Sequence, residues 1–127
     1  MSSSNTVSFK NFRLTKHDHL YEIDVFANAD FGFKELRQLI EVQKEMGGDR
    51  LPVLVLCGEY TTSDVSFLKQ LSRNGNDPYS SADAFVIQSI AQKLVANFYI
   101  KMVRPERPTK FFTSRQDALK WLGQFMT

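Results

Sequence analysis

The chain has 127 residues, a length typical of one domain. Hydrophobic residues make up 43% and charged residues 24%, so the composition predicts an ordinary globular fold. Sixteen basic residues face fourteen acidic ones, and their spread along the chain disfavours a nucleic-acid-binding protein. The densest basic group is expected to be a solvated crossover, and its members are Lys101, Arg104, Arg107 and Lys110.

The single cysteine, Cys57, excludes a disulfide within the chain and suits a reducing compartment. It ends an apolar run, where a free cysteine commonly acts as a small hydrophobic residue. The N-terminus lacks the apolar segment of a signal peptide, and no apolar run has the length of a membrane span. We therefore expect a cytoplasmic protein without a membrane span.

The first residues are polar, so 1–7 are expected to be disordered and 8–127 to form one domain. Residues 8–14 and 20–26 both alternate between apolar and polar side chains. The short polar segment 15–19 joins them. This pattern predicts an antiparallel hairpin.

A helix is predicted over 31–46, with Asp30 as its N-cap and Gly47–Gly48 as its end. The continuous apolar run 51–57 predicts a strand covered on both faces. Thr62 or Ser63 then caps a second helix, which carries three apolar residues at helical spacing.

A strand over 82–88 precedes a helix capped by Ser89 and stopped by two prolines. Its apolar side is expected to face the core: Ile90, Leu94, Val95, Phe98 and Met102. A short strand over 110–113 leads to a last helix, which starts at Ser114 and buries Trp121. The element order ββαβαβαβα predicts a mixed α/β sheet with an N-terminal antiparallel hairpin and parallel crossovers.

Eleven phenylalanines are unusual for this length. Large aromatic side chains help a small domain to build an adequate core. The excess also fits an apolar patch kept for a partner. The core explanation is favoured for the set as a whole.

Three segments carry a resemblance to the STAS-like (SpoIIAA-like) superfamily, and in particular to its small bacterial single-domain members: Asn97-Phe98, Pro105 to Thr109, and Ala118 to Leu122. The resemblance covers about residues 8–125. It implies a SpoIIAA-like fold and a chiefly non-enzymatic role in binding proteins, small ligands or lipids. Fold-level similarity is an associational argument for function only.

In anti-sigma-factor antagonists of this superfamily, a serine before the helix that follows the central strand is phosphorylated. The matching region here contains Thr61, Thr62 and Ser63, without the aspartate and glycine of the family motif. Helix N-termini favour phosphate, and Ser89 adds a second helix start at the same sheet edge. These four residues are the candidate phospho-switch or anion site, and simple helix capping is the alternative.

The segment His17-Asp18-His19 is the one His/Asp cluster, and a turn is the favoured explanation for it. We expect no metal, no cofactor and no catalytic residue. The leading hypothesis is a non-enzymatic domain that binds a protein partner or a second copy of itself. The alternative is a carrier of a small ligand or lipid, for which an apolar pocket of about 300 Å³ or more would argue.

Overall fold

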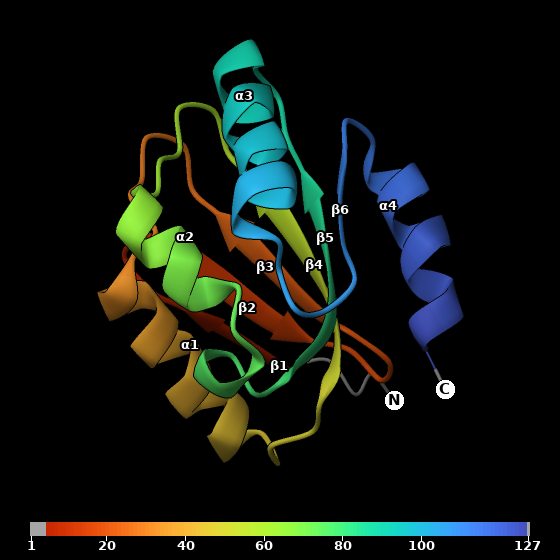
Figure 1. Ribbon diagram of the computed structural model, residues 1–127. Helices are drawn as coiled ribbons and strands as arrows, with labels where there is room; N and C mark the ends of the chain where they lie inside the picture. Colours follow the sequence, from red (N-terminus) through yellow and green to blue (C-terminus); the bar gives the residue numbers. More distant parts are fainter. Residues whose placement is uncertain (1–4, 127) are drawn as a thin grey trace.

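The computed structural model describes residues 5–126 and contains one sheet with helices on both faces (Figure 1). The strands are β1 (Asn5–Ser8), β2 (Phe12–Lys16), β3 (Tyr21–Val25), β4 (Leu51–Cys57), β5 (Ser80–Val86) and β6 (Thr109–Phe112). The helices are α1 (Phe33–Glu45), α2 (Val65–Leu71), α3 (Ile90–Phe98) and α4 (Arg115–Leu122).

The strands lie in the sheet in the order in which they follow along the chain. β1 pairs with β2 and β2 with β3 in antiparallel fashion, whereas β3, β4, β5 and β6 are parallel neighbours. Parallel neighbours need a crossover, and here each crossover contains a helix. The predicted mixed topology is therefore confirmed.

Strand β1 is the one strand of residues 5–126 that was not predicted. The expected single strand over 8–14 is two strands, because the chain reverses between Ser8 and Phe12 and Phe9 N–H donates to the Phe12 carbonyl. The predicted boundary at residue 8 thus falls at the end of β1. Residues 1–4 of the segment predicted to be disordered lie outside the described residues.

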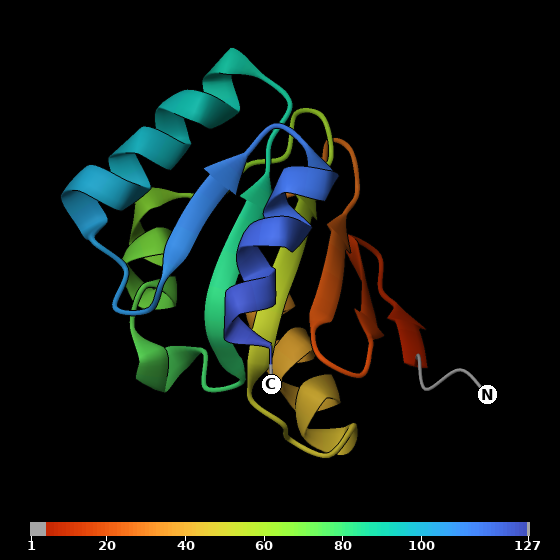
Figure 2. The same ribbon diagram turned by 90° about the vertical axis from the view of Figure 1, so that its right-hand side faces the viewer.

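Helices α1, α2 and α3 cover one face of the sheet, and α4 lies on the other (Figures 1 and 2). The larger core lies under the three helices and contains Phe12, Tyr21, Leu36 and Phe67. The smaller core joins α4 to strands β4 and β5. Strand β4 contributes to both cores, as its continuous apolar run predicted.

The N-cap of α1 was predicted wrongly. Gly32 occupies that position, and the Glu35 carboxylate accepts from the Gly32 N–H over 2.9 Å. Asp30 instead accepts a hydrogen bond from the Thr62 hydroxyl and forms an isolated parallel bridge with Thr62. The predicted glycine end is confirmed, since Gly47 and Gly48 have φ values of 114° and 70°.

The cap of α2 was also predicted wrongly, because Asp64 rather than Thr62 or Ser63 accepts from the Phe67 N–H over 2.8 Å. Thr62 pairs with Asp30 in the segment after β3, so α2 begins only at Val65. By contrast, Ser89 caps α3 and Ser114 caps α4 as expected, over 3.1 Å and 3.3 Å.

The expected burial of the apolar side of α3 is wrong. The exposed fractions of Ile90, Leu94 and Met102 are 81%, 66% and 71%. The helix instead turns Ala96 and the following Tyr99 toward the sheet. A π-helical turn over Tyr99–Val103 follows α3 and ends at Arg104, which has a left-handed backbone just before Pro105.

Among the helices of residues 5–126, none combines the length and the hydropathy that crossing a membrane requires.

Candidate functional site

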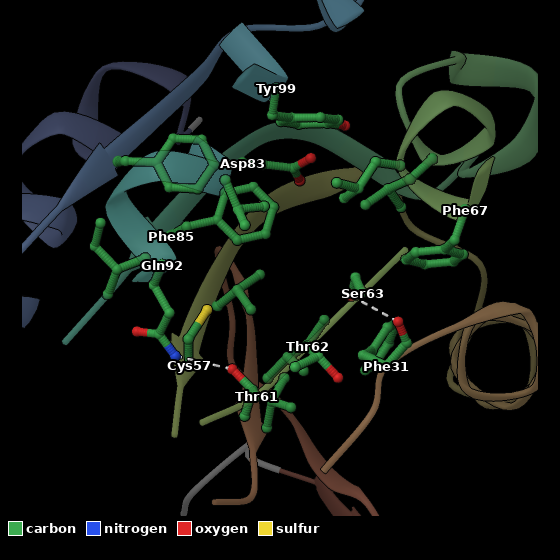
Figure 3. A pocket seen from close by; sticks show the side chains of 18 of the residues that line it. Phe31, Cys57, Thr61, Thr62, Ser63, Phe67, Asp83, Phe85, Gln92 and Tyr99 are labelled. Atoms are coloured by element: carbon green, nitrogen blue, oxygen red, sulfur yellow. Dashed lines mark hydrogen bonds between the residues drawn. The ribbon is translucent and has the colours of Figure 1, made fainter. Parts of the chain in front are cut away.

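A cavity of about 460 Å³ lies between the sheet and helices α1, α2 and α3 (Figure 3). Its apolar walls come from β3, β4 and β5 on one side and from α1 and α2 on the other. The strand residues point to the helix-covered face because side chains alternate along a strand. Six apolar wall residues represent these elements: Ile23, Val53, Val55, Leu36, Leu39 and Leu68.

Aromatic rings form a large part of the wall. The rings of Phe85 and Phe111 stack with centroids 4.8 Å apart, and Tyr99 meets both edge-on. Phe31 and Phe67 also line the cavity, and their ring centroids are 6.0 Å apart. The phenylalanine excess therefore serves both the core and the lining of this cavity.

The cavity opens between the loop after β4 and the first turns of α3. The lining residues at this end include Tyr60, Thr62 and Val95, whose side chains are exposed, whereas most of the other wall residues are buried. Gln92 bridges the opening, since its side-chain amide donates to the Gly58 carbonyl over 2.9 Å and to the Thr61 hydroxyl over 3.1 Å. This contact ties α3 to the loop.

The structure places all four sequence-predicted site residues at this opening. Each hydroxyl already has a partner. Thr61 accepts from Gln92, Thr62 donates to Asp30, Ser63 donates to the Phe31 carbonyl over 2.6 Å, and Ser89 caps α3. The four residues thus lie together around the cavity mouth, and their role as a phospho-switch or anion site stays a prediction.

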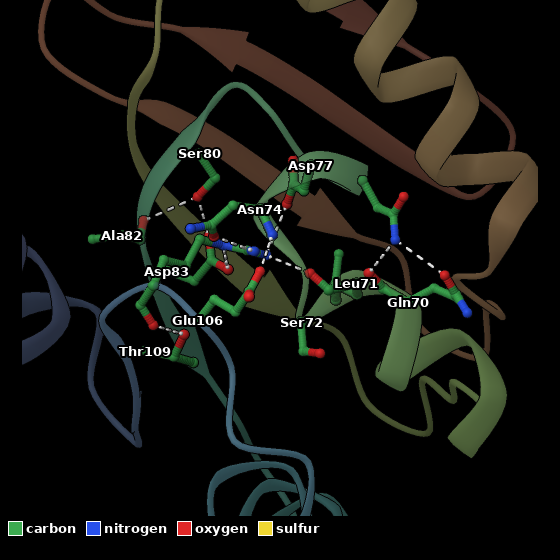
Figure 4. A network of polar contacts seen from close by, with 12 residues as sticks. Gln70, Leu71, Ser72, Asn74, Asp77, Ser80, Ala82, Asp83, Glu106 and Thr109 are labelled. Carbon is green, nitrogen blue, oxygen red and sulfur yellow. Dashed lines mark hydrogen bonds and ion pairs between the residues drawn. The ribbon is translucent and has the colours of Figure 1, made fainter.

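The opposite end of the cavity is polar and buried. Asp77 and Asp83 line it (Figure 4), and Arg107 forms an ion pair with each of them. The Arg107 guanidinium donates to Asp83 over 2.8 Å, to Asp77 over 3.0 Å and to the Leu71 carbonyl over 2.9 Å. Ser80 donates to the other oxygen of Asp83. Arg107 was expected to be solvated, and its burial corrects that prediction.

Electrostatics at this end favour proton retention by one carboxyl group. Burial and the nearby Asp83 carboxylate raise the pKa of Asp77 to about 7, although Arg107 acts in the opposite direction. Burial acts to lower the pKa of Arg107, but Asp83 and Asp77 together raise it above its ordinary value, so the guanidinium stays charged. The cluster therefore holds one fixed positive charge against two acidic groups.

Two further polar groups that line the cavity have no hydrogen-bond partner within residues 5–126. They are both amide atoms of Gln43 and the hydroxyl group of Tyr99. Gln43 is fully buried and Tyr99 is 1% exposed, and both residues line the cavity. Buried polar groups normally have partners, so these unpaired groups are unusual. Burial also raises the pKa of the Tyr99 hydroxyl, which stays protonated.

Sequence reasoning missed Gln43, Asp83 and Tyr99. The available signal was a polar side chain at a position that periodicity assigns to the core. Gln43 follows Leu36 and Leu39 on the buried face of α1, and Asp83 interrupts the apolar run of β5.

Cys57 lies in the cavity wall at the end of β4. Desolvation raises the pKa of its thiol to about 12, so the group is protonated at neutral pH. In the described chain, no group of three or more histidine, cysteine, aspartate or glutamate side chains could hold a metal ion. His17 contacts Glu22 over 3.0 Å in the turn region before β3.

These features define a mixed α/β domain with a ligand-sized cavity that is apolar along its walls and polar at its buried end. A family model described as a domain of unknown function, DUF7793, matches residues 17–126. The chain belongs to this family.

No curated protein matches the sequence. Among solved structures, the chain is similar to the crystal structure of an uncharacterized protein of the DUF3478 family from Shewanella loihica PV-4, described as having a SpoIIAA-like fold. The identity is 16%, the match covers 94% of this chain and 92% of that chain, and the TM-score is 0.46.

Proposed function

We propose that this domain binds a small, largely apolar ligand in the cavity under α1, α2 and α3. The observation that carries this proposal is the cavity itself. Its volume of about 460 Å³ lies within the range of roughly 300–1,000 Å³ that is typical of small-molecule sites, in a domain of only 127 residues. The volume also exceeds the value of about 300 Å³ above which a carrier was expected.

The composition of the cavity lining favours binding of an organic molecule over binding of an ion. Aromatic and aliphatic side chains form the walls, and a few polar groups lie at the two ends. Apolar walls with a few well-placed polar groups are the usual composition of such sites. The ligand would enter beside Gln92, where α3 and the loop after β4 meet.

We infer further that the domain binds its ligand without a reaction. Cys57 is the strongest nucleophile in the wall, and its raised pKa keeps it in the unreactive thiol form. Asp83 is already engaged by Ser80 and Arg107, which leaves it poorly placed to act as a general base.

The test fills the cavity from β4. Val55→Phe adds a ring to the wall, whereas Leu56→Phe adds a similar volume on the same strand toward α4. Displacement of a fluorescent apolar probe by octanol should be detected with wild type and with Leu56→Phe, and lost with Val55→Phe. Circular dichroism would establish that both variants fold. Equal binding by the two variants would contradict the proposal.

A second candidate function is association with a protein, as the leading sequence hypothesis held. The exposed apolar side chains Ile90, Leu94 and Met102, on α3 and the π-helical turn after it, favour this function, because large exposed apolar groups often mark interaction sites. A second copy of the chain is the simplest partner. Sedimentation at increasing concentration should show dimers that Leu94→Ser abolishes, and a monomer at all concentrations would exclude self-association.

A further inference from the structure

We propose that the ligand carries an uncharged hydrogen-bonding head group, such as an alcohol or a primary amide, and that this head group lies at the buried end of the cavity beside Gln43 and Tyr99. This inference rests on the proposed function, since it assigns the chemistry of the ligand of the same cavity.

The first observation is the unpaired amide of Gln43. Its Nε2 donor and Oε1 acceptor both lack partners in the described residues, and the side chain is completely buried in the cavity wall. An unpaired buried amide destabilises the protein, because its polar atoms have lost their hydrogen bonds to water without gaining others. A bound alcohol or amide would offer both a donor and an acceptor to this group.

The second observation is the hydroxyl group of Tyr99, which comes from a different element. The ring is fixed against Phe85 and Phe111, so the hydroxyl direction is set by packing. This hydroxyl also lacks a partner in the described residues. Two independent orphaned groups, both neutral, therefore line one cavity.

The charged residues of the cavity lining disfavour a ligand with an ionic head group. The lining residues include no lysine, arginine or histidine, and the charged ones are Asp77 and Asp83. Arg107 lies behind these carboxylates, with its donors directed to Asp77, Asp83, Asn74 and the Leu71 carbonyl. A carboxylate or phosphate would thus enter a low-dielectric site without a counter-ion, which is unfavourable. An ammonium group would compete with Arg107 for carboxylates that are already paired.

The experiment compares ligands that share one octyl chain and differ in the head group. Octanol, octanamide, octanoate, octylamine and octane are titrated at pH 8 against the probe-loaded protein. Octanol and octanamide should bind about tenfold more tightly than octane, as expected for one or two hydrogen bonds. Octanoate and octylamine, both charged at this pH, should bind more weakly than octanol.

Two variants connect this preference to the named groups. Gln43→Leu and Tyr99→Phe each remove hydrogen-bonding atoms and keep the approximate side-chain volume. Either variant should reduce the preference for octanol over octane by about fivefold, while octane binding is retained. Gln116→Leu, on α4 at the other face of the sheet, is the control and should leave the preference unchanged.

The outcomes separate the two proposals. If all five ligands bind equally, or if octanoate or octylamine binds most tightly, the head-group assignment is overturned while the cavity remains a binding site. An unchanged preference in both variants would also overturn it. If no ligand displaces the probe, both the head-group assignment and the proposed function are contradicted.

Discussion

Arg107 and Asp83 form a buried ion pair, with the guanidinium Nε 2.8 Å from the carboxylate Oδ2 and both side chains at most 4% exposed. The pair joins the segment before β6 to the middle of β5, which are parallel neighbours in the sheet. Through Asp77 and the Leu71 carbonyl, the same guanidinium also holds the end of α2. One side chain thus organises the buried end of the cavity.

We expect Arg107→Met to destabilise the protein by about 3–5 kcal/mol, because it leaves two carboxyl groups buried without a cation. The control is Arg73→Met, which removes an exposed pair with Glu106 at 3.6 Å and should cost at most about 1 kcal/mol. Urea unfolding at pH 7 measures both values. Similar losses for the two variants would contradict the importance assigned to the buried pair.

Asp77 should make stability depend on pH. Its pKa is about 7 in the folded protein and 3.8 in an unperturbed aspartate, so the folded state holds this proton more tightly. The stabilising contribution is complete below about pH 4 and declines as the pH rises toward 7.

Asp77→Asn should remove this decline, because the amide does not titrate. The difference in unfolding free energy between the variant and wild type, measured at intervals from pH 4.5 to 7.5, should therefore move in favour of the variant as the pH increases. Parallel curves would show that Asp77 does not hold a proton in the folded protein.

Gly58 should tolerate no side chain. A Cβ atom there would lie 2.6 Å from the Val25 carbonyl oxygen and 2.6 Å from the Ala27 nitrogen, both backbone atoms. Gly58→Ala should cost on the order of 1–3 kcal/mol through this overlap. Gly75→Ala is the matched control, since nothing lies within 4 Å of its added Cβ. Thermal melting compares the two, and an unaffected Gly58→Ala would argue against the close strand contact.

The attachment of α4 should depend more on Leu122 than on Trp121. Leu122 is fully buried, whereas Trp121 is only half-buried and packs against Phe112 and Phe125. The expected burial of Trp121 was thus only partly correct. Leu122→Ala should cost about 2–5 kcal/mol and Trp121→Ala less than that. The reverse order in chemical denaturation would contradict this packing.

Much of the fold could be predicted because its signals are local. The apolar run 51–57 and the caps Ser89 and Ser114 are confirmed residue by residue. The caps Asp30 and Thr62 were mispredicted because these two residues pair with each other across 32 positions of sequence. The capping preference of a residue contains no information about a partner that is so distant in sequence.

The candidate site was only partly predictable for a similar reason. The mouth residues gather at the sheet edge that parallel topology defines, so their proximity could be predicted. The cavity could not, because the apolar side of α3 that was expected to fill the core faces outward. Arg107 looked like one of several surface cations, and its buried partners come from a loop and a strand that precede it by 24 to 30 positions.

The most direct test of the central claim is a methyl nuclear magnetic resonance spectrum recorded during a titration with octanol. Ile23 and Leu39 line the cavity, whereas Ile90 and Leu94 lie on the exposed side of α3. If the domain binds its ligand internally, the methyl signals of Ile23 and Leu39 shift and saturate while those of Ile90 and Leu94 stay nearly unchanged. Shifts confined to Ile90 and Leu94 would contradict the account, because they would place the apolar binding surface on the outside of the helix.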